Sequence, residues 1–172
     1  MKHIKLPKGF LANGIHCGSK KKRKDLSLIF SEVPCKVEAL FTKNIVKAAP
    51  VILAEKQLKK NKRIRAVVIN SGNANCMTGA KGIKDAKKTI NTASKMLGVK
   101  KNEVLVSSTG IIGEFMNMSP IIKGMKTLVK GLSDKGIEDA ACGIMTTDSF
   151  RKISSRTFTA GGKRIKIIGI AK

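Results

Sequence analysis

The chain has 172 residues, enough for a single domain with a buried core, and we treat residues 1–172 as one domain. Hydrophobic residues make up 42% and charged residues 27%, which excludes a disordered chain, and no apolar run approaches the roughly 18 residues of a membrane-spanning helix. The net charge of +24 makes a nucleic-acid partner the first hypothesis.

The basic residues are mostly lysines, which weakens this hypothesis. There are 29 Lys and 6 Arg, whereas recognition of bases and phosphates favours the planar fork of arginine. Trp and Tyr, which stack on bases, do not occur in the sequence. The clusters Lys20–Lys24 and Lys59–Arg65 lie in predicted loops or at helix ends, where solvated lysine explains them without a partner. A basic nucleic-acid-binding module stays as an alternative, and we expect no specific nucleic acid to bind.

The cysteines and the N-terminus indicate a cytoplasmic protein without a metal site. The four cysteines lie far apart in the sequence: Cys17, Cys35, Cys76 and Cys142. There is no CxxC pair, and the only histidines are His3 and His16. We therefore expect free thiols and no bound metal. The N-terminal residues have neither the apolar core of a secretory signal nor the Arg- and Ser-rich composition of a transit peptide.

In the first half of the chain, short apolar runs predict strands at Ser27–Phe30, Val37–Thr42, Val51–Ala54 and Arg65–Asn70. Apolar residues at helical spacing then predict a helix from about Lys81 to Leu97, and Gly98 supplies the stop.

In the second half, Glu103–Ser108 predicts another buried strand. Ser119 followed by Pro120 is typical of an N-cap and first helical residue, and an amphipathic helix follows. Arg156–Thr159 and Arg164–Ile168 flank an Ala-Gly-Gly turn and predict a hairpin. The pattern indicates an α/β fold, a sandwich of sheet and helices, with the strand order left open.

Three polar, Gly-containing loops follow the apolar runs: Asn70–Gly79, Ser107–Gly113 and Gly143–Asp148. Such loops are where α/β proteins place binding and catalytic groups, although Asn, Gly, Ser and Thr are also ordinary turn and cap residues. None matches a phosphate-binding loop or a nucleophile elbow. Hydroxyls beside a Gly N–H suit the stabilisation of an oxyanion in acyl transfer, but a nucleophile with its base is missing.

Taken together, the loops and two flanking segments resemble the ornithine acetyltransferase family, also known as bifunctional glutamate N-acetyltransferase/amino-acid acetyltransferase. The matching segments, in family order, are Phe41–Val51, Ala66–Gly79, Ser107–Gly113, Gly143–Asp148 and Gly169–Lys172. The resemblance spans nearly the whole chain, as the α (N-terminal) portion of a longer precursor. It implies an α/β sandwich shared with DmpA-type aminopeptidases and incomplete without the β chain.

The resemblance also implies a mechanism. In this family the precursor cleaves itself, and the new N-terminal Thr of the β chain is both nucleophile and, through its amine, base. The cleavage point is expected shortly after Lys172, so the chain alone is not expected to be active. The implied reaction moves an acetyl group from N-acetylornithine to glutamate in arginine biosynthesis, in an α2β2 assembly. No cofactor is implied, with acetyl-CoA as a co-substrate of bifunctional members.

Four positions of this chain match functional positions of the family. Thr109 and Gly110 match the oxyanion-hole pair, and Thr146 and Lys172 match substrate-contacting residues. Without the resemblance, the first pair would be a turn with a cap and Lys172 a frayed terminal lysine.

The sequence departs from the family pattern at Cys76-Met77, Ser149, Arg151 and Ile168. A non-catalytic remnant therefore stays as an alternative, as does a related aminopeptidase with an N-terminal nucleophile.

Overall fold

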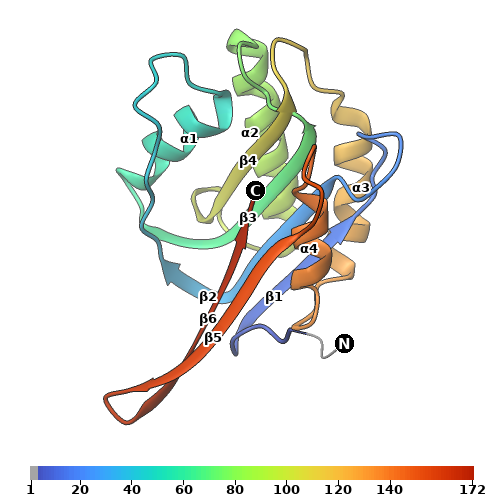
Figure 1. Cartoon of the computed structure of the whole chain (residues 1–172). Helices are drawn as coiled ribbons and strands as arrows, with labels where there is room; N and C mark the ends of the chain where they lie inside the picture. The colour runs from blue at the N-terminus through green and yellow to red at the C-terminus, as the bar shows by residue number, and fades with distance from the viewer. Residues whose placement is uncertain (1–3) are drawn as a thin grey trace.

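A mixed four-stranded sheet forms the centre of the protein (Figure 1). The structure is a computed structural model that describes residues 4–172, so His3 lies outside the described residues. The strands are β1 (Phe10–Ile15), β2 (Leu26–Lys36), β3 (Arg63–Asn73) and β4 (Val104–Ile111), in spatial order β1-β2-β3-β4. The first two pairings are antiparallel, and β3 runs parallel to β4.

Helices α2 (Gly79–Leu97) and α3 (Met118–Lys130) cover one face of this sheet. Helix α2 is the crossover that joins the parallel strands β3 and β4, as a parallel pair requires. Alternate strand residues point into this layer and meet one side of each helix; the core is formed by Leu26, Leu28, Phe30, Ala66, Val68, Ala86, Ile90, Ala93, Val104, Val106, Met116, Ile121, Met125 and Leu128. This layer contains most of the buried apolar surface.

The opposite face is covered more sparsely, by helix α4 (Ile137–Gly143) and by a hairpin of β5 (Lys152–Ala160) and β6 (Lys163–Ala171). Figure 1 shows the tip of the hairpin projecting away from the sheet. Helix α4 crosses β1 closely, because a Cβ atom at Gly14 would lie only 2.0 Å from the Asp139 carbonyl oxygen.

Two of the predicted strands are wrong. Val51–Ala54 lies in helix α1 (Ala49–Leu58), with Pro50 in its first turn; the run continues into Ala, Glu, Lys, Gln and Leu, which favour a helix. Val37–Thr42 is irregular, because the chain leaves the sheet after Lys36. The segment keeps one hydrogen bond to the residue that precedes β3, from the Val37 N–H to the Lys62 carbonyl oxygen.

The other predicted elements are confirmed with shifted ends. Strands β2, β3 and β4, helix α2 with its left-handed Gly98, and the final hairpin are all present. The cap of α3 is a correction: the Asn117 side chain accepts the Ser119 N–H, so the helix begins earlier than predicted. Strand β1 and helix α4 were not predicted, and a short 3₁₀ turn at Lys101–Glu103 precedes β4.

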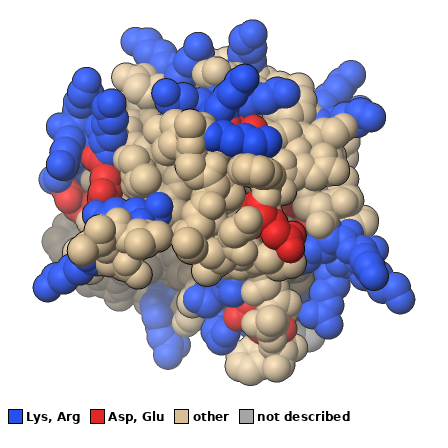
Figure 2. Space-filling model, turned by 90° about the horizontal axis from the view of Figure 1, so that it is seen from above, with Lys and Arg blue, Asp and Glu red and all other residues tan. Residues whose placement is uncertain are grey.

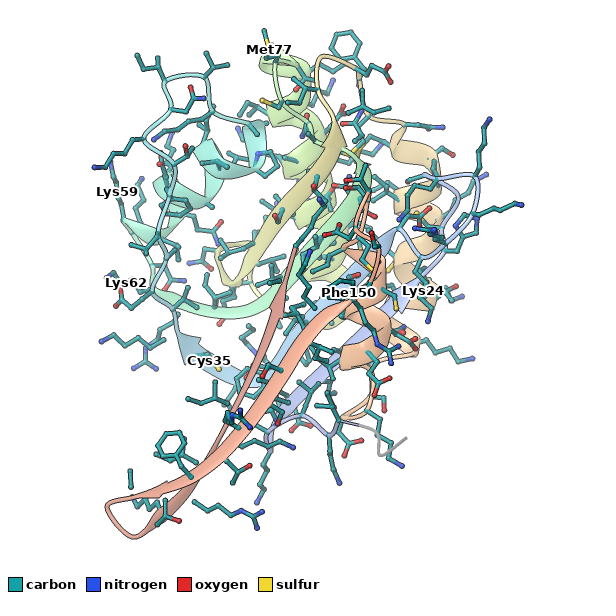
Figure 3. The ribbon with its side chains drawn as sticks, viewed as in Figure 1. Lys24, Cys35, Lys59, Lys62, Met77 and Phe150 are labelled. Atoms are coloured by element: carbon teal, nitrogen blue, oxygen red, sulfur yellow. The ribbon has the colours of Figure 1, made fainter. Side chains whose placement is uncertain are left out.

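The basic residues do not form one continuous patch. Figure 2 shows Lys and Arg side chains around the rim of one face, with a tan area between them. In Figure 3, Lys24 lies on the opposite side of the molecule from Lys59 and Lys62, so the two sequence clusters are well separated. This arrangement does not favour a nucleic-acid-binding module. Among the described helices, none is both long and apolar enough to cross a membrane.

Candidate active site

The predicted oxyanion pair lies at the carboxyl ends of the two parallel strands. Thr109 and Gly110 occupy the end of β4, where Ser71 is the neighbour of Thr109 and Gly72 that of Gly110 on β3. Because side chains alternate along a strand, Ser71 and Thr109 project to the same face of the sheet, away from α2 and α3. The ends of adjacent parallel strands are the usual place for a binding site in an α/β fold.

Glycine is required at position 110. Its φ is +136°, and a Cβ atom there would lie 2.3 Å from the carbonyl carbon of Gly72. The loop after β3 is tied to β4 as well: Ser108 Oγ donates to Asn70 Oδ1 at 2.5 Å, and the Ala74 N–H donates to Ile111 at 2.9 Å. The backbone N–H groups at this sheet end are therefore held in fixed directions.

The loop from Gly143 to Asp148 is attached to the same strand ends. Ser71 Oγ donates to the Gly143 carbonyl oxygen at 2.7 Å, and Ser71 is buried. This hydrogen bond fixes the end of α4 against β3, at the residue that lies directly beside Thr109 on the neighbouring strand. The sheet face that carries Thr109 is thus also the face from which the segment containing Thr146 begins.

Thr146 and Lys172 meet at one carboxylate. The Thr146 N–H donates to Asp148 Oδ2 at 3.1 Å, and Lys172 Nζ lies 3.4 Å from the same oxygen. Lys152 Nζ pairs with the other oxygen, Oδ1, at 2.8 Å. The hydrogen bond from Lys152, followed by that from the Thr146 N–H, holds the pKa of Asp148 well below its ordinary value, and the charge of Lys172 acts in the same direction. Asp148 therefore carries a negative charge that organises both predicted substrate residues.

A second buried carboxylate, Asp25, anchors the loop between β1 and β2. It accepts the backbone N–H groups of Cys17 at 2.6 Å, Gly18 at 3.2 Å and Lys20 at 2.9 Å, and His16 Nδ1 lies 3.2 Å away. Burial by itself would raise the pKa of Asp25, but the hydrogen bonds from Cys17 and Lys20 and the nearby His16 outweigh it, so the pKa lies below its ordinary value. The Asp25 main chain also accepts the Ser71 N–H at 2.9 Å, which joins this loop to the site.

Lys20 extends from the anchored loop to the strand ends. A Cβ atom built on Gly72 would lie 3.0 Å from Lys20 Cγ, so the lysine stem fills the space beside Gly72. Lys20 Nζ donates to the Met145 carbonyl oxygen at 2.9 Å.

Three of the residues that depart from the family pattern, Met77, Arg151 and Ile168, have contacts or positions that the structure describes. Met77 has φ +57° and its side chain is exposed at the top of the molecule, at the end of the loop that leads to α2 (Figure 3). Arg151 Nη2 pairs with Glu138 at 3.0 Å, and Ile168 packs against the smaller core cluster.

The four predicted residues thus form two pairs that are connected through other side chains. Thr109 and Gly110 are joined to Thr146 and Lys172 through Ser71 and Asp148. Asp148 and Ser71 both belong to loops that the sequence singled out, but neither was named there as a site residue, and Lys20 was not named either. A serine or an aspartate in a polar loop and one lysine in a basic run are all common. The four cysteines are free thiols, and the described residues contain no group of three metal-ligating side chains.

The arrangement offers hydrogen-bond donors, which suit the oxygen of an acyl group, and an ordered lysine, which suits a carboxylate. Both are features expected of a site for an acylated, negatively charged small molecule.

Residues 11–172 match the ArgJ family. The chain is 48% identical to the arginine biosynthesis bifunctional protein ArgJ of Caldanaerobacter subterraneus, over 98% of this chain and 42% of that protein. A crystal structure of the corresponding Bacillus halodurans protein has a TM-score of 0.90 at 33% identity and covers 99% of this chain and 93% of the solved one. The Mycobacterium tuberculosis ornithine acetyltransferase, solved with ornithine, has a TM-score of 0.88 at 33% identity, covering 99% and 91%.

The chain thus spans less than half the length of the curated relative but nearly all of each solved chain.

Proposed function

This chain belongs to the ArgJ family, and on that premise we propose that it is the N-terminal (α) part of an enzyme that transfers the acetyl group of N-acetylornithine to glutamate. The observation that supports this most directly is the connection of Thr109 and Gly110, through Ser71, to the segment in which Thr146 and Lys172 meet at Asp148. One half of this arrangement suits a developing oxyanion, and the other suits a charged amino-acid substrate.

In the proposed reaction, Thr109 Oγ and the Gly110 N–H donate to the acetyl oxygen as it becomes negative. The nucleophile is the N-terminal Thr of a β chain, whose hydroxyl attacks the acetyl carbon while its amine takes the proton. The tetrahedral intermediate expels the amine of ornithine, which receives that proton, and leaves an acetyl ester on the Thr. The amine of glutamate then attacks the ester, giving N-acetylglutamate and the free Thr hydroxyl.

Thr146 and Lys172 hold the substrate in this proposal. The ammonium of Lys172 makes a charge-assisted hydrogen bond to a carboxylate of the acetylated amino acid. Its position beside Asp148 keeps the long side chain ordered before substrate arrives. Organisation in advance lowers the entropy cost of binding.

A nucleophile on a second chain, as proposed, is consistent with the lengths of the relatives. The curated relative is covered over 42%, whereas the solved chains are covered over 91–93%, so the solved chains are much shorter, as products of precursor cleavage would be. We further propose that residues 1–172 act as one domain in an α2β2 assembly in the cytoplasm. The enzyme needs no metal or organic cofactor, and acetyl-CoA serves as a co-substrate if the enzyme is bifunctional.

The test uses the full-length protein, consisting of this chain with its natural continuation. We expect mass spectrometry to find two chains, the second beginning with Thr, and N-acetylglutamate to form from N-acetylornithine and glutamate. A matched sample in which that Thr is replaced by Ala should remain uncleaved and inactive. A cleaved protein that hydrolyses peptides but transfers no acetyl group would instead support the aminopeptidase alternative, and an uncleaved, inactive protein would support the remnant.

A further inference from the structure

Lys20 differs from the other basic residues of its cluster. Lys21, Lys22 and Arg23 are exposed, and Lys24 pairs with Asp139 on the surface at 2.5 Å. Lys20 is only partly exposed, its stem lies against Gly72, and its ammonium donates to a main-chain carbonyl oxygen 125 residues away. It therefore does not belong to the solvated surface that explains the rest of the cluster.

The contacts of Lys20 involve both halves of the candidate site. Gly72 is the strand neighbour of Gly110, and Met145 directly precedes Thr146. At its base, the Lys20 N–H is bound by the buried Asp25, which also fixes Cys17 and Gly18 and accepts the Ser71 N–H. Both ends of the lysine are thus held, one by a buried anchor and the other by the loop that carries Thr146.

We propose that Lys20 is a positioning residue that sets the place of Thr146 relative to the Thr109–Gly110 pair. This role rests on the proposed acetyl transfer, since it acts through residues of that site. The rigid end is the strand pairing of Gly72 with Gly110, and the part being placed is the loop Gly143–Asp148. A shift of about 1 Å in a substrate-positioning group is enough to cost a large factor in rate or binding.

The environment of the ammonium is consistent with this role. Burial lowers the pKa of Lys20, with the charge of Arg23 acting in the same direction and that of Asp25 opposing it. A partly desolvated ammonium depends more on its protein acceptor than an exposed one does, because less water replaces a lost contact. The hydrogen bond to Met145 should therefore persist in the working enzyme.

The test compares Lys20→Met, Lys20→Arg and Lys22→Met in the full-length, processed enzyme. Methionine keeps an unbranched stem beside Gly72 and removes the ammonium, arginine keeps a cation, and Lys22 is an exposed lysine of the same loop with the same charge. We expect Lys20→Met to raise KM for N-acetylornithine by roughly 10–100-fold, the range for loss of a hydrogen bond from a charged group. Single-turnover acetylation at saturating substrate should change less than about threefold, because the Thr109–Gly110 pair is held by the strand pairing.

The KM of Lys20→Arg should lie at least halfway back from that of Lys20→Met to the wild-type value on a logarithmic scale. The KM of Lys22→Met should stay within about twofold of the wild-type value. The proposal is contradicted if the KM of Lys20→Met also stays within twofold of the wild-type value. It is equally contradicted if Lys22→Met raises KM as much as Lys20→Met does, because the effect would then come from the overall charge. If Lys20→Met does not fold, Lys20→Gln takes its place; failure of both to fold would make Lys20 a structural residue and overturn the proposal. A wild type that transfers no acetyl group would contradict the proposed function itself, whereas an active wild type with an unaffected Lys20→Met contradicts only the role of Lys20.

Discussion

Gly110 lies so close to Gly72 that no side chain fits at position 110. A Cβ atom there would be 2.3 Å from the Gly72 carbonyl carbon and 2.5 Å from the Asn73 nitrogen. The φ of +136° is also one that L-residues rarely adopt. The direction of the Gly110 N–H, which the proposed oxyanion hole uses, is therefore set by backbone packing.

Gly110→Ala is expected to destabilise the protein by ~2–5 kcal/mol, combining backbone strain with overpacking against main-chain atoms that cannot move aside. Gly113→Ala is the matched control, since Gly113 also has a positive φ, +84°, but a Cβ atom there meets open space. That control should cost only about 1 kcal/mol. Urea unfolding of both variants measures the difference, and equal losses would show that the contact with Gly72 is unimportant.

The lowered pKa of Asp148 predicts an acid-dependent contribution to stability. Its folded pKa lies below the unfolded value of about 3.9, so the contribution is complete above that value and is lost as the pH falls through the folded pKa. The urea midpoint of wild type should exceed that of Asp148→Asn above about pH 5, and the gap should shrink below about pH 4.

Asp139→Asn is the control for this measurement, because Asp139 pairs with Lys24 on the exposed surface. Exposed ion pairs contribute little, so its midpoint should stay near that of wild type at every pH. If the difference in urea midpoint between wild type and Asp148→Asn increased as the pH fell, the result would contradict the contacts assigned to Asp148.

Lys172→Ala should weaken substrate binding more than it slows the chemistry. The ammonium is proposed to hold a carboxylate in both the ground state and the transition state, so KM for N-acetylornithine should rise by roughly tenfold with little change in the single-turnover rate. Lys163→Ala, in the exposed tip of the hairpin, is the control and should leave KM unchanged. An unchanged KM in Lys172→Ala would show that Lys172 is a surface residue that does not bind the substrate.

The parts of the fold that could be predicted are those with a strong local pattern. Helix α2 carries apolar residues at regular spacing and ends at Gly98, and β3 is rich in β-branched residues, so both were predicted close to their observed bounds. Val51–Ala54 was wrongly predicted as a strand, because four apolar residues after a proline fit a strand or a helix equally well. The helix is decided by the residues that follow and by packing of Leu58 and Leu53 against the core.

Candidate site residues could be named from the sequence only where a recognisable motif carries them. Thr109, Gly110, Thr146 and Lys172 stand in such motifs, whereas the contacts that connect them are long-range. Ser71 reaches Gly143 across 72 residues and Lys20 reaches Met145 across 125, and nothing local to either residue announces the partner. Pairings of this kind are set by the tertiary fold.

In the proposed reaction, Thr109 stabilises the charge that develops on the acetyl oxygen. The most direct measurement is the single-turnover rate of acetyl-enzyme formation in Thr109→Ala, using co-expressed or pre-cleaved α and β chains so that maturation does not interfere. We predict a rate lower by roughly 10²–10³, the loss expected for one oxyanion donor, with far less change in binding of N-acetylornithine. Thr109→Ser, which keeps the hydroxyl, should recover most of the rate. An unchanged rate in correctly processed Thr109→Ala enzyme would contradict the oxyanion role of Thr109 and leave it as a turn residue at the end of β4.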